Sequence, residues 1–223
     1  MILDAGVDFK EVQKALNFNF RNVLGVLVTH EHKDHCKYLT NFALNGINIY
    51  ASAGTFEKLN LKGHRFISVK KLQQFNIGDF IILPFDTQHD AQEPLGFLIQ
   101  NKVTQEKLLY ATDTYYIKYK FNKLNYILLE CNYMSSILKE NIETGKVHKA
   151  RYTRLLESHF SLENVIEFLK SNDLKNTEKI VLCHLSDQNS NEVIIQQTVS
   201  NITGIDTIIA RPNLVIELEK YPF

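Results

Sequence analysis

Hydrophobic and polar residues follow two different spacings along this chain, and these spacings predict its strands and helices. Short apolar runs that end at polar or turn residues are typical of buried strands. Such runs cover residues 1–6, 24–29, 47–50, 65–69, 80–84, 96–100, 107–112, 126–130 and 179–183, and residues 214–218 are expected to close the chain.

Apolar residues at helical spacing predict five helices between these strands. The first begins near Phe9, and the second runs from about residue 34 to residue 44. Ser52 and Ser161 each precede a helical segment as an N-cap, because a serine hydroxyl can accept a hydrogen bond from the first turn. The helix after Ser161 presents one apolar stripe, and a last helix covers residues 193–199.

The order of these elements predicts the fold class. Strands follow one another through the first half of the chain and then alternate with helices. This order favours a layered α/β fold, and we expect an αββα sandwich in which helices flank two mixed sheets. With 223 residues, of which 44% are hydrophobic, the chain is expected to form one domain over residues 1–223.

The charge balance of the chain gives no support for binding to nucleic acid. Lys+Arg and Asp+Glu both number 25, so the formal net charge is zero. Attraction of the whole molecule to nucleic acid therefore cannot be argued from charge, although a local basic patch is still compatible with it.

The cysteines indicate a reducing compartment. Cys36, Cys131 and Cys183 lie far apart and form no CxxC pair, which fits the cytosol better than a disulfide framework. Each is expected to be a small buried residue rather than a metal ligand. No apolar stretch has the length of a membrane span, and no signal peptide is recognised, so we expect a soluble, cytoplasmic protein without a membrane partner.

The densest cluster of ligand-type residues follows the second predicted strand, in the run Thr-His-Glu-His-Lys-Asp-His. This run places His30, His32, Asp34 and His35 within six residues. His30 and His32 on a tight loop can turn to one ion, whereas the adjacent Asp34 and His35 at a helix start point to a second. Two metals roughly 3.5–4 Å apart would clamp the attacking and leaving oxygens of an in-line displacement. A solvated polar loop is the alternative, and the density of ligand-type residues argues against it.

Other predicted strands are also followed by ligand-type residues. Asp113 and His184 each follow a strand directly, and His89 lies in a loop just after another. Alone, each would be interpreted as a structural histidine or a turn-forming aspartate. Beside an incomplete metal cluster, we interpret them as further ligands. Asp4 and Glu130 are weaker candidates, and Asp4 could orient a ligating histidine.

Taken in order, the motif His-x-His-x-Asp-His followed by His89, Asp113 and His184 resembles the signature of the metallo-β-lactamase-fold hydrolases. The segments ILDAG, GVLVTHEHKDH, HDAQEPLGF, YATDTYY, ESHFSLENV and LCHLSDQNSNEV are similar to the YycJ (WalJ)-type branch, which includes phage-encoded relatives. The similarity runs nearly end to end. These motifs are specific for the superfamily and less specific for a substrate.

The resemblance implies two divalent metal ions, of which Zn²⁺ suits the nitrogen and oxygen ligands best, with Mn²⁺ or Fe as alternatives. The implied ligands are His30, His32 and His89 for the first metal, Asp34, His35 and His184 for the second, and Asp113 as a bridge.

The same resemblance implies a mechanism of hydrolysis. The metals would lower the pKa of a water molecule toward about 7 and so supply a hydroxide. His159 lies at a position that supplies a proton donor in related phosphodiesterases, and it would protonate the leaving oxygen. His159 and Asp34 are the residues expected to take part in catalysis.

Relatives of this branch begin with a further strand and a Gly-Ser-x-Gly-Asn loop before the position of Met1. Without them, one sheet is expected to be a strand short, with an open edge at residues 1–3 that proteins usually cover. Pairing with a second chain would cover the edge, so a homodimer is expected. If a phage encodes the chain, its compartment would be the host cytoplasm.

The resemblance favours a metal-dependent phosphodiesterase that hydrolyses nucleic acid, a nuclease acting on DNA or RNA. Three basic residues, Lys149, Arg151 and Arg154, precede His159, and tyrosines and lysines follow Asp113. Basic and aromatic residues together can bind phosphates and stack bases, although a solvated face is equally compatible with them.

Three other functions stay open. One is a phosphodiesterase for small cyclic nucleotides, as in phage proteins that disarm nucleotide-signalling defence, and the neutral net charge fits a small substrate somewhat better. Another is a lactonase or thioesterase. The last is a metal-binding module without turnover, against which the complete ligand set argues.

Overall fold

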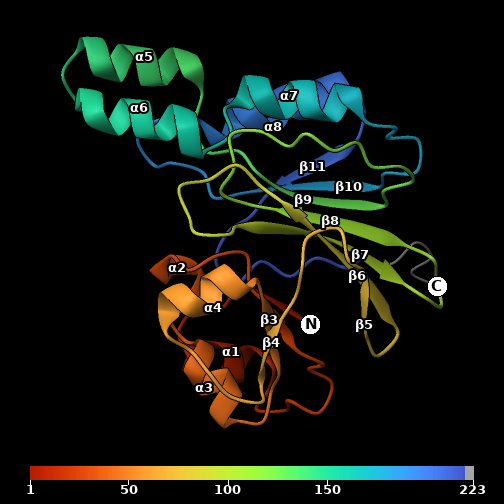
Figure 1. Cartoon of the computed structure of the whole chain (residues 1–223). Coiled ribbons are helices and arrows are strands. Elements are labelled where there is room, and N and C mark those ends of the chain that lie inside the picture. Colours follow the sequence, from red (N-terminus) through yellow and green to blue (C-terminus); the bar gives the residue numbers. More distant parts are fainter. Residues whose placement is uncertain (219–223) are drawn as a thin grey trace. The chain divides into compact units, whose positions relative to one another are not determined.

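The structure, a computed structural model, describes residues 1–218, except for the side chains at positions 150 and 151. It contains two compact units (Figure 1). The first comprises residues 1–86 and 91–103, and the second comprises residues 87–90 and the chain from residue 104 onward. Each unit is described by itself below, and the single domain over residues 1–223 stays a prediction.

The first unit contains a parallel sheet with the strand order β1-β2-β3-β4. Its strands are short and apolar because the centre of the sheet is buried, and Val26, Leu27 and Ile49 have no exposed surface. Helices contribute Phe9, Leu39, Phe42 and other side chains to the same core. The elements are β1 (Ile2–Leu3), α1 (Phe9–Ala15), β2 (Val26–Leu27), α2 (Lys33–Cys36), α3 (Leu39–Leu44), β3 (Ile49–Ala51), α4 (Ala53–Leu59) and β4 (Phe66–Ser68).

The helix predicted over residues 34–44 is wrong in one respect, because the structure divides it into α2 and α3. The backbone of Ala5 causes the break. Its N–H donates to the carbonyl of His35 at 2.7 Å, and its carbonyl accepts from the N–H of Tyr38 at 2.9 Å. A segment 30 residues away in the sequence thus satisfies groups that a continuous helix would have paired internally.

The first unit also contains an antiparallel ladder of β5 (Phe75–Ile77), β6 (Phe80–Asp86) and β7 (Leu95–Asn101). Strand β5 was not predicted, because it is three residues long and only Ile77 is buried. Gly78, with φ 54°, begins the two-residue turn to β6, and glycine adopts this left-handed conformation without strain.

The second unit contains four parallel strands in the order β11-β10-β9-β8. Strands β9 and β10 match the predicted ranges, because both are continuous apolar runs. Strand β11 replaces the closing segment predicted at residues 214–218, which has no regular structure. The strands are β8 (Lys107–Ala111), β9 (Tyr126–Glu130), β10 (Lys179–Cys183) and β11 (Asp206–Ile209).

The described residues of the second unit form four helices, of which α8 packs against β11 and α7 lies beside α8 (Figure 1). The Ser161 hydroxyl accepts from the N–H of Asn164 at 3.1 Å, which confirms the predicted N-cap of α7. Helices α5 and α6 were not predicted, because most of their residues are polar. Among the described residues, no helix is long and apolar enough to cross a membrane. The helices are α5 (Ser135–Glu143), α6 (Lys149–Ser158), α7 (Leu162–Ser171) and α8 (Glu192–Thr203).

Candidate metal centre

Each unit carries part of the predicted ligand set, at the carboxyl ends of parallel strands. Parallel strands end at one edge of a sheet, so residues that follow neighbouring strands come close together. In the first unit Asp4 follows β1 and Thr29 follows β2. Asp4 accepts hydrogen bonds from the Thr29 N–H at 2.8 Å and the Thr29 hydroxyl at 3.0 Å, and its Oδ2 lies 2.8 Å from Nδ1 of His35. The structure therefore places Asp4 where it orients His35.

The ring of His30 is oriented by the same group of residues. Because the Thr29 hydroxyl donates to Asp4, it is free to accept from Nδ1–H of His30, which lies 3.0 Å away. This tautomer leaves a lone pair on Nε2 of His30, which lies 3.0 Å from Nδ1 of His32. Two facing ring nitrogens need a proton or a cation between them, and a transition metal fits this requirement.

Asp34 and His35 lie together at the start of α2. Nε2 of His35 is 3.5 Å from Oδ2 of Asp34, whose side chain is largely exposed. The backbone of Gly6 packs directly against the backbone of Asp34, so that a Cβ on Gly6 would stand 1.5 Å from the Asp34 carbonyl oxygen. The first unit thus presents His30, His32, Asp34 and His35 with their supports.

The buried cysteine next to these ligands is a thiol rather than a ligand. Burial raises the pKa of Cys36 to about 11, and its Sγ donates to the carbonyl of Glu31 at 3.0 Å. Metals bind the thiolate, so this environment disfavours ligation. The interpretation of Cys36 as a buried filler residue is consistent with this contact.

In the second unit three strands deliver one polar side chain each to the same edge. Glu130 ends β9, which lies between β8 and β10, and it pairs in register with Cys183. Asp113 comes just after β8 and His184 directly after β10. Both leave their strands through a left-handed backbone conformation, with φ 49° at Asp113 and φ 58° at His184.

Glu130 is the residue whose importance the sequence understated. Its side chain is fully buried, and Oε1 lies 2.6 Å from Nδ1 of His159 and 2.8 Å from Nδ1 of His184. Oε2 accepts from the backbone N–H of Thr114 at 2.9 Å and of Phe160 at 3.2 Å. Its position at a strand end was the only signal, because no motif residue adjoins it. One carboxylate therefore holds two imidazoles.

Asp113 lies between two of the predicted ligands. Its Oδ1 is 3.0 Å from Nδ1 of His184, and its Oδ2 is 3.5 Å from Nε2 of His89. Nδ1 of His89 lies 2.9 Å from the carbonyl of Ser158, which fixes the tautomer and leaves the lone pair of Nε2 toward Asp113. Asp113, Glu130, His159 and His184 each offer one ligand atom, all within 4.8 Å of one another.

The carboxylates of Asp113 and Glu130 favour a positive charge beside them, on His184 or on a bound cation. Burial lowers the pKa of His184, but hydrogen bonds to Asp113 and Glu130 outweigh it and raise that pKa to about 10. Burial also lowers the pKa of His89, which favours the neutral ring that binds metals. Both donor sets, nitrogen and oxygen only, thus fit a divalent metal such as Zn²⁺.

Two cavities of the second unit open onto these residues. One, of about 460 Å³, is lined by His159, His184, Asn132 and Arg154 among others. The other, of about 680 Å³, includes His89 and Arg154 in its lining.

The weak substrate-binding predictions have different outcomes. Arg154 lines both cavities, and its Nε lies 2.8 Å from Oδ2 of Asp90. Lys149 begins α6 and is absent from the linings of both cavities as far as the described residues extend. Arg151 lies outside the described side chains.

Replacing Glu130 with glutamine is expected to destabilise the protein by about 1–3 kcal/mol, measured by urea unfolding of metal-free protein. In either orientation the amide NH₂ would face two of the four N–H donors that the carboxylate now satisfies. The exposed Glu140 on α5 provides the matched control, since Glu140→Gln should leave the midpoint unchanged. Equal midpoints for both variants would contradict the assigned role of Glu130.

Comparison with known proteins gives consistent matches. The family model described as "Beta-lactamase superfamily domain" matches residues 1–185. "Exodeoxyribonuclease YycJ" of Bacillus anthracis is 28% identical over 220 residues, covering 91% of this chain and 80% of that protein. "Exodeoxyribonuclease WalJ" of Streptococcus pneumoniae is 25% identical and covers 90% and 79%.

Solved structures agree on the fold. The metallo-β-lactamase fold protein YhfI from Bacillus subtilis superposes with a TM-score of 0.67 at 14% identity, over 96% of this chain and 86% of that one. At such low identity the likeness concerns the fold alone. The predicted αββα class is thereby confirmed.

Proposed function

This chain belongs to the beta-lactamase superfamily, whose fold binds divalent metals, and we propose that it is a metal-dependent phosphodiesterase that cleaves nucleic acid. One observation carries the proposal. Buried Glu130 holds both His184, which also adjoins Asp113, and His159, which lines a cavity. A candidate ligand and a candidate proton donor are thus fixed by one carboxylate.

The proposed ligands are those that the sequence predicted. We assign one metal to His30, His32 and His89, the second to Asp34, His35 and His184, and a bridging role to Asp113. Divalent cations, when bound, lower the pKa of a water molecule and neutralise charge on phosphate oxygens. Zn²⁺, Mn²⁺ and Fe all suit these donors, so the identity of the metal belongs to the proposal.

The proton donor proposed for the leaving oxygen is His159. His159 directly follows α6, and its ring lines the cavity of about 460 Å³. Nδ1 of the ring lies 2.6 Å from Oε1 of Glu130. The carboxylate accepts a hydrogen bond from Nδ1–H and so orients the ring, and in the imidazolium form Nε2–H would supply the transferable proton. Asp34, largely exposed beside His35, is proposed to act as a ligand within the catalytic group.

Nucleic acid is proposed as the substrate because two relatives are named exodeoxyribonucleases. Hydrolysis of bis(p-nitrophenyl) phosphate with and without added metal tests for a phosphodiesterase and separates it from a lactonase, a thioesterase or a module without turnover. Incubation with duplex DNA, single-stranded DNA and cyclic mononucleotides side by side then separates a nuclease from a cyclic-nucleotide phosphodiesterase. Hydrolysis of cyclic mononucleotides alone would contradict the nuclease.

Protein purified without chelator is expected to hold close to two transition-metal ions per chain, because seven ligands exceed one tetrahedral site. Chelation should lower the melting temperature, since a ligand that binds only the folded state stabilises it by about 2.7 kcal/mol per site at 100 times its Kd. Elemental analysis and thermal melts check both results.

His30→Ala should lower the metal content, whereas His64→Ala should not, because His64 is exposed and lies outside the predicted ligands. An absence of bound metal in the parent protein after reloading would contradict the proposal.

A further inference from the structure

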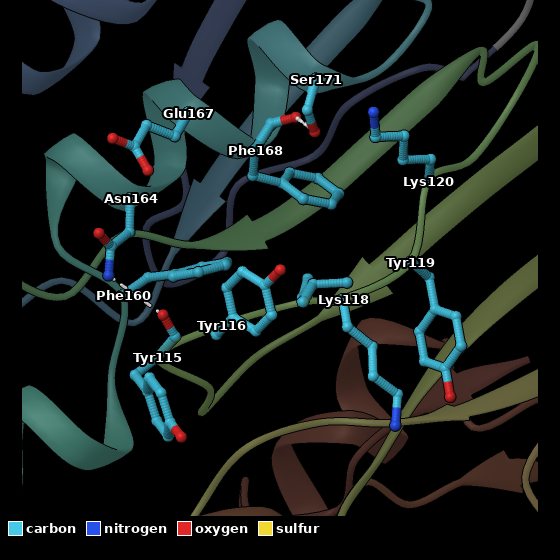
Figure 2. Close-up of a pocket in the computed structure, with 11 residues that line it drawn as sticks. Tyr115, Tyr116, Lys118, Tyr119, Lys120, Phe160, Asn164, Glu167, Phe168 and Ser171 are labelled. Atoms are coloured by element: carbon cyan, nitrogen blue, oxygen red, sulfur yellow. Dashed lines mark hydrogen bonds between the residues drawn. The ribbon is translucent and has the colours of Figure 1, made fainter.

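A third cavity of the second unit, of about 350 Å³, has no role in the chemistry proposed above (Figure 2). It lies along the segment that follows Asp113 and against helix α7. Its size is within the range of small-molecule sites. The lining is aromatic, basic and amide-bearing, and includes Tyr115, Tyr116, Lys118, Lys120, Phe160, Asn164, Glu167 and Phe168.

The backbone on one side of this cavity is held firmly in place. The buried Thr114 hydroxyl donates to the carbonyl of Tyr116 at 2.8 Å, and the N–H of Tyr115 donates to the carbonyl of Gln88 at 3.1 Å. Asn164 on α7 donates from Nδ2 to the carbonyl of Tyr115 at 3.1 Å. Ile117 is buried and anchors the segment. The backbone that carries Tyr115 and Tyr116 is therefore positioned by these contacts.

Two aromatic rings are left accessible on this fixed segment. Tyr115 is 37% exposed and Tyr116 is 56% exposed, whereas Phe160 and Phe168 of the same lining are buried. Figure 2 shows the Tyr116 ring beside Phe160 and facing the cavity. A flat apolar ligand that stacks on Tyr116 would cover a surface that now faces water.

Charge is distributed unevenly around these rings. Lys118 and Lys120 lie on the irregular segment between β8 and β9, whereas Asn164 and Glu167 lie on α7 (Figure 2). Lysine ammonium groups suit phosphates, whereas an amide and a carboxylate suit the donor and acceptor edge of a base. A nucleotide has both parts.

This cavity and the two cavities described earlier have lining residues in common. Tyr115 lines both this cavity and the one that contains His89, and Arg154 lines both that one and the one that contains His159 and His184. The three cavities of the second unit therefore neighbour one another through these two side chains. Neighbouring sites suit successive nucleotides of a strand better than one small cyclic nucleotide.

We propose that this cavity is a nucleobase subsite for an unpaired nucleic-acid strand, in which Tyr115 and Tyr116 stack a base while Lys118 and Lys120 contact flanking phosphates. The inference rests on the proposed function and specifies its substrate as single-stranded. DNA and RNA share this chemistry.

Binding of the holoenzyme to a fluorescent, hydrolysis-resistant phosphorothioate oligothymidylate tests the subsite by anisotropy. Tyr116→Ala should weaken binding by roughly 5- to 100-fold, the range for loss of one stacked base, and Tyr116→Phe should restore it. The double variant Lys118→Gln/Lys120→Gln should reduce the slope of log K against log salt by about 1.4, since each phosphate contact on a single strand contributes about 0.7. The exposed pair Lys139→Gln/Lys146→Gln is the matched control.

A second variant gives a readout independent of affinity. The chain contains no tryptophan, so Tyr116→Trp would introduce a single fluorophore at the proposed stacking position. Binding of the oligonucleotide should quench its fluorescence, because a stacked base quenches indole. Oligouridylate and duplex DNA in parallel arms distinguish DNA, RNA and paired strands.

The outcomes separate this inference from the proposed function. Unchanged binding by Tyr116→Ala and by the lysine pair, or unquenched tryptophan at saturating oligonucleotide, would overturn the subsite. Binding of duplex as tight as that of single strands would overturn it as well. Failure of the parent to hydrolyse bis(p-nitrophenyl) phosphate would instead contradict the phosphodiesterase, whatever the binding shows.

Discussion

Replacing His159 with alanine is expected to lower turnover on DNA by about 10²–10⁴ while the metal content stays at the parent value. The ring lies on the loop between α6 and α7, lines a cavity and is oriented through Nδ1 by Glu130. A group in that position can deliver a proton without being needed to hold a metal. Steady-state kinetics together with elemental analysis of the same preparation check both parts.

The leaving group provides the internal control for this prediction. The loss should be much smaller on bis(p-nitrophenyl) phosphate, because p-nitrophenolate scarcely needs protonation. His184→Ala should behave differently, with lower metal content and loss of activity on both substrates, since His184 adjoins both Asp113 and Glu130. Parent rates on both substrates, or loss of metal, in His159→Ala would show that the proton-donor role is wrong.

Gly6→Ala is expected to cost at least about 3 kcal/mol of unfolding free energy and to lower the metal content. The added Cβ would stand 1.5 Å from the Asp34 carbonyl oxygen and 2.2 Å from its carbon, and both atoms belong to backbone. Overpacking usually costs about 1–3 kcal/mol, and a backbone neighbour cannot rotate away as a side chain can. Relief of this clash must move the residues that carry Asp34 and His35. Urea unfolding and elemental analysis measure the two effects.

Gly145→Ala is the matched control for this substitution. Gly145 has φ 73°, and a Cβ there would meet no atom within 4 Å. Only the cost of a left-handed backbone remains, about 1–2 kcal/mol, and the metal content should not change. Similar losses of stability and metal in both variants would mean that crowding at Gly6 is unimportant.

The sequence predicted those parts of the fold that depend on local apolar runs. Strands β9 and β10 have the predicted bounds because each is a five-residue run that lies in the middle of a sheet. The ligand-type residues were recognisable for a related reason, since His184 and Asp113 come just after such runs. Strand-end position and residue type marked them as candidates, the family resemblance supplied the ligand set, and their metal binding stays a prediction.

Features that depend on distant contacts could not be predicted. The break between α2 and α3 results from hydrogen bonds to Ala5, which no local pattern reveals. Glu130 was weighed as a weak candidate because its partners, His159 and His184, lie 29 and 54 residues away. Among the described residues, helices α5 and α6 pack on a small cluster around Tyr133, Leu138 and Val147, which needs few apolar residues, so their sequences are mostly polar.

The left-handed backbone at the strand ends has a consequence for how these positions tolerate mutation. Asp4, Asp113 and His184 have φ values of 59°, 49° and 58°, which glycine and asparagine accept most easily and β-branched residues resist. In a library of all single substitutions, sorting for folded protein alone should deplete valine and isoleucine at position 184, because β-branched side chains resist this backbone conformation. Sorting for hydrolysis should keep histidine. Both selections would therefore exclude β-branched residues at this position, and selection for activity would in addition require the imidazole.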